Sequence, residues 1–254
     1  MMNDPADQIR AYYKDLYAAW GRQHWWPAHS RFEVIVGAYL TQNTAWTNVE
    51  RALNELRSAG LLSVAGIRRT PLQGVERLIR SSGYFRQKAR RLKTFVRFLD
   101  RGYGGSLTRM FAEPTDQLRE QLLALDGVGP ETADSILLYA GNHPVFVVDA
   151  YTRRVLERHG IVDRDADYEE IRELFEGALA PTEVCNEATE DGSFRGPEGS
   201  CHAPSKMSTA ARAPLVQVFN EMHGLIVGVG KNYCKKSQIR CEQCPLQKYL
   251  PKKF

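Results

Sequence analysis

The sequence predicts an all-α protein, and three features of the 254-residue chain support this fold class. Apolar residues recur with helical spacing over most of the chain, as they do between Asp7 and Trp20. No alternating apolar and polar run is long enough to indicate a sheet, and the apolar run Val145–Val148 is too short. Two closely spaced glycines, Gly127 and Gly129, interrupt the helical pattern and predict a hairpin between two helices.

An apolar face recurs in eleven segments, and each of them predicts a helix. The segment Cys185–Pro214 differs from these, because it has few large apolar residues and is rich in Gly, Pro, Ser and Glu. Such a segment cannot offset its own ordering entropy, so we expect a disordered surface insertion over residues 185–214. The expected helices cover residues 7–20, 32–40, 49–59, 61–67, 75–79, 107–110, 115–125, 132–140, 150–159, 168–179 and 215–228.

The composition limits the kinds of protein that the chain can be. A net charge of +4 and a pI of about 8.8 permit a polyanionic partner without requiring one. Five cysteines cannot all pair, and three of them cluster near the C-terminus, which argues against a disulfide framework. No apolar run reaches the length of a membrane span, and residues 1–11 contain no signal-peptide core. We therefore expect a soluble, cytoplasmic protein.

The hairpin Leu125–Gly129 is followed by Pro130, which suits the first position of a helix. Backbone amides at such a helix start converge, unpaired, where an anion such as phosphate can bind. Asp149 lies 18 residues after Glu131 and begins a second helix. Separately, a glycine turn and an aspartate N-cap are common structural features. Together, at this spacing, they favour a functional interpretation.

A phosphate-binding hairpin followed by a carboxylate at a helix start resembles the helix-hairpin-helix DNA glycosylases. This resemblance implies a two-lobed, all-α fold with the active site between the lobes. One lobe is expected to be a helical barrel of residues 30–143, and the other to combine residues 1–29 with residues 144–254. The resemblance also implies that Asp149 is the catalytic residue and that the hairpin region binds DNA through Gly127, Val128, Gly129 and Thr132.

Trp25, Trp26 and Pro27 are expected in a turn, because the residue before a proline disfavours a continuous helix. The two tryptophans could fill the seam between lobes, or they could form an aromatic wall against which an extruded base stacks. The same Trp-Trp-Pro sequence before a phenylalanine-led helix resembles the 3-methyladenine DNA glycosylase III group. That resemblance places Trp25, Trp26 and Pro27 in the base pocket.

Two further segments resemble the same superfamily. Gln42, in the polar turn Thr41–Thr44, matches a glutamine that enters the duplex near the site vacated by the flipped base. The segment Ser82-Gly83-Tyr84 leads into a basic run in which six of the twelve residues from Arg86 to Arg97 are basic. A charge run is usually a solvated face. Near the predicted phosphate-binding hairpin, we interpret it as a DNA backbone contact made by Lys88, Arg90 and Arg91.

Cys234, Cys241 and Cys244 have the spacing C-x6-C-x2-C, which suits zinc or an iron–sulfur centre. The spacing resembles that of endonuclease III, where a fourth cysteine completes a [4Fe–4S] cluster. Leu250 occupies that fourth position here. The resemblance favours an iron–sulfur cluster whose fourth ligand is unassigned, with Cys185, Cys201 or a non-cysteine group as candidates. Zinc and the absence of any metal are the alternatives.

Glu131 distinguishes between two types of glycosylase. In enzymes of the superfamily that also nick DNA, a lysine at this position attacks the sugar and forms a Schiff base. Glutamate cannot form that bond, and the 3-methyladenine glycosylase III group also has glutamate here. We therefore expect Glu131 to line the base pocket of an enzyme without lyase activity. One departure from this group is Leu225, which replaces a lysine.

The expected activity is hydrolysis of the N-glycosidic bond of a damaged, alkylated base that is flipped out of duplex DNA by a monomeric enzyme. An ionised Asp149 would stabilise the oxocarbenium-like sugar and orient the attacking water. One alternative is an endonuclease III-like glycosylase for oxidised or deaminated bases. Another is a DNA-binding module without catalytic activity.

Overall fold

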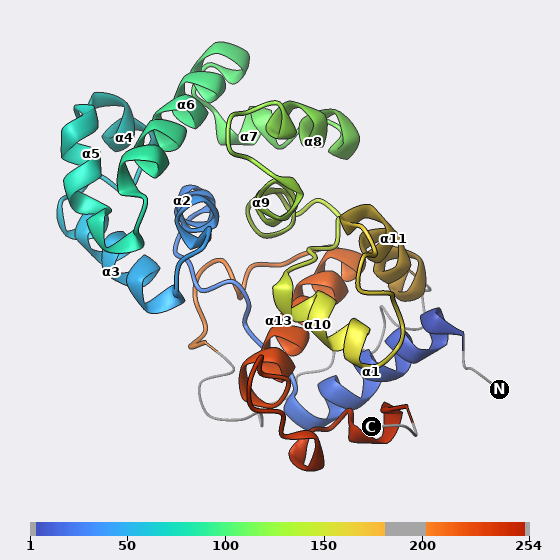
Figure 1. Ribbon diagram of the computed structural model, residues 1–254. Coiled ribbons are helices and arrows are strands. Elements are labelled where there is room, and N and C mark those ends of the chain that lie inside the picture. The colour runs from blue at the N-terminus through green and yellow to red at the C-terminus, as the bar shows by residue number, and fades with distance from the viewer. Residues whose placement is uncertain (1–3, 181–201, 252–254) are drawn as a thin grey trace. The chain divides into compact units, whose positions relative to one another are not determined.

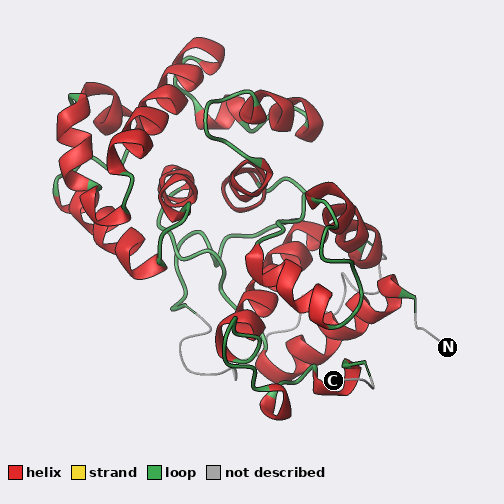
Figure 2. Cartoon of the chain, viewed as in Figure 1, coloured by secondary structure: helices red, strands yellow, loops and turns green. Residues whose placement is uncertain are grey.

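The computed structural model describes residues 4–180 and 202–251 (Figure 1). Helices account for the regular structure of these residues, and an isolated bridge between Cys234 and Ile239 is the one strand-like pairing among them (Figure 2). The prediction of an all-α fold is confirmed. No helix within the described ranges combines the length and the apolar character that a membrane crossing requires.

The chain forms two compact units. The hairpin unit comprises residues 28–141, and the aspartate unit comprises residues 1–27 and 142–254. The boundaries expected from the sequence are residues 30 and 143.

The hairpin unit is organised around α2 (Arg31–Thr41), in which every residue from Phe32 to Leu40 is buried. A helix that is buried on all sides has to be covered by neighbours, and α2 packs against α3, α6, α9 and η2. Ser30 caps its first turn by accepting a hydrogen bond from the Glu33 amide at 3.1 Å. The other elements are α3 (Trp46–Ser58), α4 (Val64–Arg69), α5 (Leu72–Leu78), η1 (Arg80–Ser82), α6 (Phe85–Tyr103), α7 (Leu107–Met110), α8 (Thr115–Leu123), α9 (Pro130–Ser135) and η2 (Ile136–Gly141).

The aspartate unit is organised in the same way around α13 (Pro214–Asn232), in which every residue from Val216 to Gly230 is buried. Two glycines allow close packing on this helix. A Cβ atom at Gly230 would lie 2.3 Å from a ring carbon of Tyr151, and one at Gly224 would lie 3.2 Å from Cβ of Trp25. The remaining elements are α1 (Pro5–Trp20), α10 (Ala150–Arg158), α11 (Tyr168–Leu179), η3 (Cys241–Gln243) and η4 (Gln247–Tyr249).

Two expectations about local structure need correction. The helix expected over residues 132–140 begins as α9, but from Ile136 it continues as the π-helical segment η2. The expected insertion 185–214 is not disordered throughout. Its residues 185–201 lie outside the described residues, but residues 202–213 pack within the aspartate unit, and α13 begins at Pro214.

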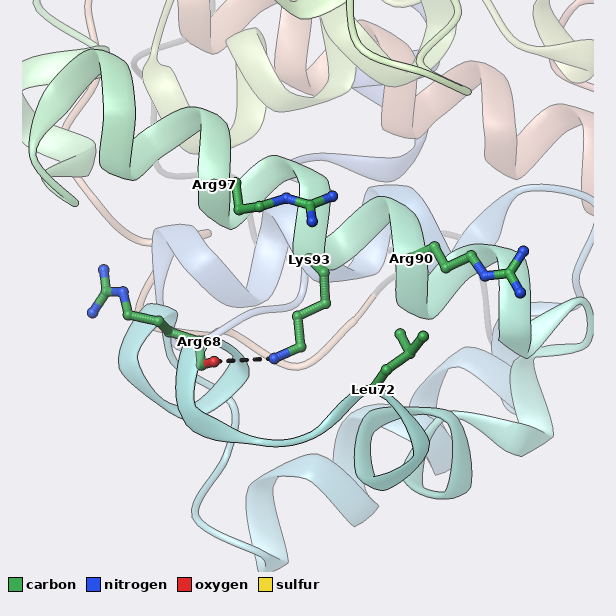
Figure 3. Close-up of a pocket in the computed structure, with 5 residues that line it drawn as sticks. All are labelled: Arg68, Leu72, Arg90, Lys93 and Arg97. Carbon is green, nitrogen blue, oxygen red and sulfur yellow. Dashed lines mark hydrogen bonds between the residues drawn. The ribbon is translucent and has the colours of Figure 1, made fainter.

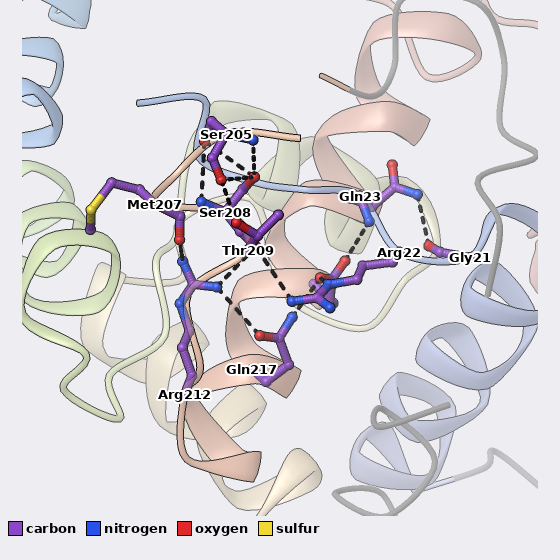
Figure 4. Close-up of polar contacts among 10 residues, drawn as sticks. Gly21, Arg22, Gln23, Ser205, Met207, Ser208, Thr209, Arg212 and Gln217 are labelled. Atoms are coloured by element: carbon purple, nitrogen blue, oxygen red, sulfur yellow. Dashed lines mark hydrogen bonds and ion pairs between the residues drawn. The ribbon is translucent and has the colours of Figure 1, made fainter. Parts of the chain in front are cut away.

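Residues 202–213 are held in place by polar contacts that the composition did not reveal (Figure 4). Ser208 is buried, and its carbonyl oxygen accepts a hydrogen bond from Arg22 at 3.4 Å. Arg212 donates to the carbonyl oxygen of Met207 at 2.5 Å, and its other terminal nitrogen lies 3.4 Å from the side-chain oxygen of Gln217 on α13. Arg22, Arg212 and the buried Met207 therefore hold a segment that has few apolar residues.

The same network surrounds a buried carboxylate, Glu221 on α13. One of its oxygens accepts a hydrogen bond from the Gln23 amide at 2.6 Å, and the other accepts one from the Gln217 side chain at 2.6 Å. Arg22 approaches it at 3.5 Å. Burial raises the pKa of Glu221 to about 7, although these partners and Arg212 act to lower it.

Candidate active site and DNA interface

The hairpin is shaped by Gly127, whose φ of +73° lies in the left-handed region that favours glycine. Arg91 from α6 lies against it, and a Cβ atom at this position would be 1.8 Å from Nε of Arg91. Gly129 caps α9 through its carbonyl oxygen, which accepts from the amides of Thr132 and Ala133 at 3.0 Å each. Of the other predicted DNA contacts in the hairpin, Gly129 is exposed and Val128 is buried.

Gln42 joins the turn after α2 to this hairpin. Its side-chain nitrogen donates to the carbonyl oxygen of Gly127 and to the hydroxyl of Thr132, both at 2.9 Å. Its side-chain oxygen accepts from Arg91 at 2.9 Å. Gln42, Arg91, Gly127 and Thr132, all predicted to contact DNA, therefore form one hydrogen-bonded cluster, which we call the glutamine cluster.

The interpretation of Lys88 as a phosphate contact is corrected by its surroundings. The side chain is buried, and its nitrogen donates to the carbonyl oxygens of Leu40 and Ser82 and to the hydroxyl of Thr44, at 2.7–2.8 Å. Burial, with a smaller effect from Arg91, lowers the pKa of Lys88 to about 8. Lys88 therefore joins the turn that contains Gln42 to the turn before α6, and all three of its donors are used.

Sequence reasoning missed Tyr84, which lies directly after the Ser82–Gly83 turn held by Lys88. Its side chain is 70% exposed, and its φ of +44° is unusual for a residue with a Cβ atom. An exposed aromatic ring in a helical DNA-binding candidate is suited to stacking on a base. The Ser-Gly-Tyr motif was visible in the sequence, but nothing in it showed that the ring faces solvent.

Asp149 lies in the aspartate unit as the N-cap of α10, and its two carboxylate oxygens differ in their surroundings. Oδ1 accepts hydrogen bonds from the amides of Tyr151 and Thr152 at 2.9 and 2.8 Å, and from the Thr152 hydroxyl at 3.0 Å. Oδ2 lies 3.7 Å from Nε2 of His223 on α13. The side chain is 13% exposed. The helix cap therefore fixes one oxygen and leaves the other to face the imidazole.

These partners keep Asp149 ionised at neutral pH. Burial alone would raise the pKa of its carboxyl group. The nearby His223 imidazole, with the amide and hydroxyl of Thr152, outweighs burial and holds the pKa of Asp149 below its ordinary value. Its place at a helix N-terminus also favours the anion.

Trp25 lies beside His223, with 5.8 Å between the ring centres. Lys231 lies over the Trp25 indole at 5.5 Å, and the His202 ring lies 5.2 Å away. The Trp25 indole N–H is buried and meets no acceptor among the described residues. Trp26 is also buried and packs edge-on against Trp25, and Pro27 is partly exposed. An aromatic wall with a donor for a ligand thus lies next to the imidazole that faces Asp149.

Glu131 and Asp149 were assigned to one site from their spacing in the sequence, but they belong to different units. Glu131 is exposed on α9 of the hairpin unit. Asp149 is in the aspartate unit with Trp25, Trp26 and Pro27. Within the aspartate unit, the described residues bring Trp25, His223 and Asp149 together.

The cysteine loop follows α13. Arg158 donates to Sγ of Cys234 at 3.3 Å, and Arg154 donates to the carbonyl oxygen of the same residue at 2.5 Å. Burial and the neighbouring thiols raise the pKa of Cys241, and they raise that of Cys244 to about 11 although a backbone hydrogen bond opposes them. Both shifts favour the protonated thiol at these two cysteines.

A complete metal site is not present in the part of the chain that the structure describes. No group of three or more Cys, His, Asp or Glu side chains there is arranged to hold a metal ion. Leu250 occupies the expected fourth position, and Cys185 and Cys201 lie outside the described residues. The described donors do not fit a four-thiolate cluster, so no step of the chemistry is assigned to one.

A helical protein with a glycine hairpin beside a polar cluster, and with a helix-capping aspartate ionised next to an aromatic wall, has the features of a DNA base-excision enzyme. The family model for HhH-GPD superfamily base excision DNA repair proteins matches residues 36–181. The chain belongs to this superfamily.

Individual relatives agree with this assignment. A protein of Methanocaldococcus jannaschii, whose name as a DNA repair glycosylase is itself provisional, is 38% identical over 98% of each chain. The structure is similar to that of the Helicobacter pylori 3-methyladenine DNA glycosylase MagIII bound to 1,N6-ethenoadenine, with a TM-score of 0.68 and 29% identity over 90% of this chain and 97% of the other. An endonuclease III–DNA complex shares the fold, with a TM-score of 0.72 and 22% identity over 98% and 96% of the chains.

Proposed function

We propose that this protein, acting as a monomer, hydrolyses the N-glycosidic bond of an alkylated base flipped out of duplex DNA, without cleaving the strand. The observation that carries this proposal is the asymmetry of the Asp149 carboxylate. A residue that served only as a helix cap would need one oxygen and would gain nothing from an imidazole 3.7 Å from the other. The oxygen that faces His223 is the one suited to chemistry.

In the proposed reaction, the bond between C1′ of the sugar and the base nitrogen breaks, and its electron pair leaves with the base. The sugar then carries positive charge, which the ionised Asp149 stabilises. The oxygen of a water molecule forms the new bond to C1′, and the proton that the water loses passes to solvent when the base leaves as a neutral molecule, or to the base when it leaves as an anion. Because Oδ1 is held by three donors, the carboxylate is fixed before substrate binds and needs no reorganisation.

An alkylated base is the preferred substrate class for two reasons. A base that displaced Lys231 from the face of the Trp25 indole would stack on a flat apolar ring, and an electron-poor, alkylated base stacks well there. The similar MagIII structure holds an ethenoadenine, which is an alkylated purine. An endonuclease III-like activity on oxidised bases is the second candidate, because the fold is shared with endonuclease III.

A duplex panel tests the substrate and the reaction together. Duplexes that carry single alkylated, oxidised or deaminated bases should release the alkylated base fastest, and the strand should remain intact. Preferred release of an oxidised base would favour the second candidate. No release from any duplex would favour a DNA-binding module without catalysis.

Borohydride trapping tests the absence of lyase activity. One lysine, Lys231, could form an adduct in place of the residue at position 131. Lys231 lies 5.5 Å from the Trp25 ring, so an amine is present near the proposed base pocket. If Glu131 marks an enzyme without lyase activity, the wild-type protein should give no covalent adduct with DNA. An adduct that disappears in Lys231→Gln would show that this lysine attacks the sugar.

A metal centre on Cys234, Cys241 and Cys244 stays a prediction. Protein purified without oxygen should contain about four irons per chain if these residues hold a [4Fe–4S] cluster, and about one zinc per chain if they form a zinc site. Cys241→Ser should remove the metal and lower the thermal stability. Metal-free protein with full activity would leave three ordinary thiols.

A further inference from the structure

The hairpin unit contains a basic pocket of about 340 Å³ between α6 and the segment from Arg68 to Leu72 (Figure 3). We call it the α6 pocket. Four of its five lining residues are basic, and no carboxylate lines it. The lining residues are Arg68, Leu72, Arg90, Lys93 and Arg97.

Two of the four cations are fixed by the protein itself. The Lys93 nitrogen donates to the carbonyl oxygens of Ile67, Arg68 and Thr70, where α4 ends. Arg68 forms two hydrogen bonds with Asp100, at 2.9 and 2.5 Å. These two side chains therefore build one wall of the pocket and position its charge.

The other two cations are available to a ligand. Arg90 and Arg97 are exposed, and neither contacts a carboxylate among the described residues. The hydrogen bond that Arg97 makes, to the Thr94 hydroxyl at 2.9 Å, uses one of its five donors. Two guanidinium groups with free donors therefore border the pocket, and the one carboxylate among the described residues that pairs with a lining residue, Asp100, is bound to Arg68.

The spacing along α6 separates this pocket from the glutamine cluster. Arg90, Lys93 and Arg97 are three and four residues apart, so they share one face of the helix. Arg91 follows Arg90 by one residue, points to a different face and contacts Gly127. One helix thus presents two separate groups of positive charge.

We propose that the α6 pocket binds phosphates of a nucleic-acid backbone, as an anchor separate from the hairpin. This inference rests on the DNA binding in the proposed function. Guanidinium groups match phosphate geometry through paired hydrogen bonds. Arg90 and Arg97 are separated by about 10 Å along the helix axis at 1.5 Å per residue, so they can contact different phosphates of one strand. Leu72 offers an apolar contact for the sugar between them.

The test measures binding to an undamaged duplex over a series of salt concentrations, by fluorescence anisotropy. Each phosphate contact that is lost lowers the slope of log affinity against log salt by about one. Arg97→Gln should therefore lower the slope by about one, and the Arg90→Gln, Arg97→Gln double variant by about two. Arg101→Gln is the matched control, because Arg101 is exposed on the same helix but does not line the pocket.

Equal, small effects of Arg97→Gln and Arg101→Gln would overturn the proposal. It would also be overturned if the variants bound DNA like the wild type while inorganic pyrophosphate shifted NMR signals of the wild-type pocket, since the ligand would then be a small phosphorylated molecule. Undamaged DNA requires no base release, so a protein without glycosylase activity can still show the predicted slopes. Wild-type protein that binds no duplex would remove both the proposed function and this inference.

Discussion

Asp149 and Glu221 are both carboxylates of the aspartate unit with little exposure, yet their pKa values shift in opposite directions. Both oxygens of Glu221 accept hydrogen bonds, from Gln23 and Gln217, and its side chain is 1% exposed. Asp149 concentrates three hydrogen bonds on one oxygen, and its other oxygen faces His223. Burial dominates for Glu221, whereas bonded and charged partners dominate for Asp149.

This difference separates a structural carboxylate from the one that we propose is catalytic. Glu221 links Gln23, Arg22 and α13, and neither of its oxygens is left for a substrate. Asp149 is ionised, fixed and partly exposed, which are the properties that electrostatic stabilisation of a cationic transition state requires. The number of donors alone does not distinguish them, because both groups have several. The distribution of those donors over the two oxygens does.

The largest expected effect comes from neutralising each carboxylate in turn. Asp149→Asn should lower single-turnover base release by roughly a thousandfold or more, because the charge that stabilises the sugar is lost. Folding should remain nearly intact, since asparagine also caps a helix well. Glu221→Gln is the matched control and should release base at nearly the wild-type rate. If both variants lost base release to a similar extent, or if Asp149→Asn released base at nearly the wild-type rate, the two carboxylates would not differ in function as proposed.

The next largest expected effect is a pH dependence of the free energy of unfolding, and it arises from Glu221. Its pKa is about 7 in the fold against an ordinary value of 4.5, so the folded protein binds a proton more tightly than the unfolded chain does. The stability that this proton contributes is complete below pH 4.5 and is lost as the pH rises through about 7. The pKa difference corresponds to a change on the order of 3 kcal/mol.

Urea unfolding at a series of pH values measures this contribution. The wild-type protein should lose free energy of unfolding between pH 5 and pH 8, and Glu221→Gln should lose much less over the same range. Parallel pH dependences in the two proteins would show that Glu221 does not carry the effect. Asp149 has the opposite sign, because a lowered pKa contributes stability that is lost as the pH falls through it.

The smallest expected effect concerns the pH dependence of catalysis. His223 helps to hold the pKa of Asp149 below its ordinary value, so His223→Gln should move the acid limb of the base-release profile to higher pH. His202→Gln is the matched control, because His202 also contacts the Trp25 ring but does not approach Asp149. An unshifted acid limb in His223→Gln would show that the helix cap alone sets the ionisation of Asp149.

Local chemistry explains what could be predicted from the sequence. The apolar run Phe32–Leu40 predicted the buried helix α2, and the glycines of the hairpin predicted its turn. The N-cap role of Asp149 was visible because the cap and its helix adjoin in the sequence. In each case the pattern lies within a few residues of the feature that it predicts.

Long-range contacts explain what could not be predicted. His223 is 74 residues from Asp149, and no spacing rule connects them. Lys88 and Arg90 belong to the same basic run. Lys88 is buried and donates to three acceptors, whereas Arg90 is exposed. A charge run does not show which of its members faces inward. Residues 202–213 were predicted to be disordered because their composition does not show the hydrogen bonds that Arg22 and Arg212 make to the backbone of this segment.

The hydrogen bonds of the glutamine cluster would affect how the protein searches DNA for a damaged base. If Gln42 enters the duplex as its resemblance implies, it must first give up hydrogen bonds to Gly127, Thr132 and Arg91. On insertion, the Gln42 side chain would exchange these hydrogen-bond partners for groups of the DNA. An intact base stack has no unpaired groups with which Gln42 could form hydrogen bonds. A gap left by an extruded base does offer them, so the cluster would keep Gln42 withdrawn while the protein moves along normal DNA. Breaking the hydrogen bonds of Gln42 would thus cost free energy that is recovered only where a base has left the duplex.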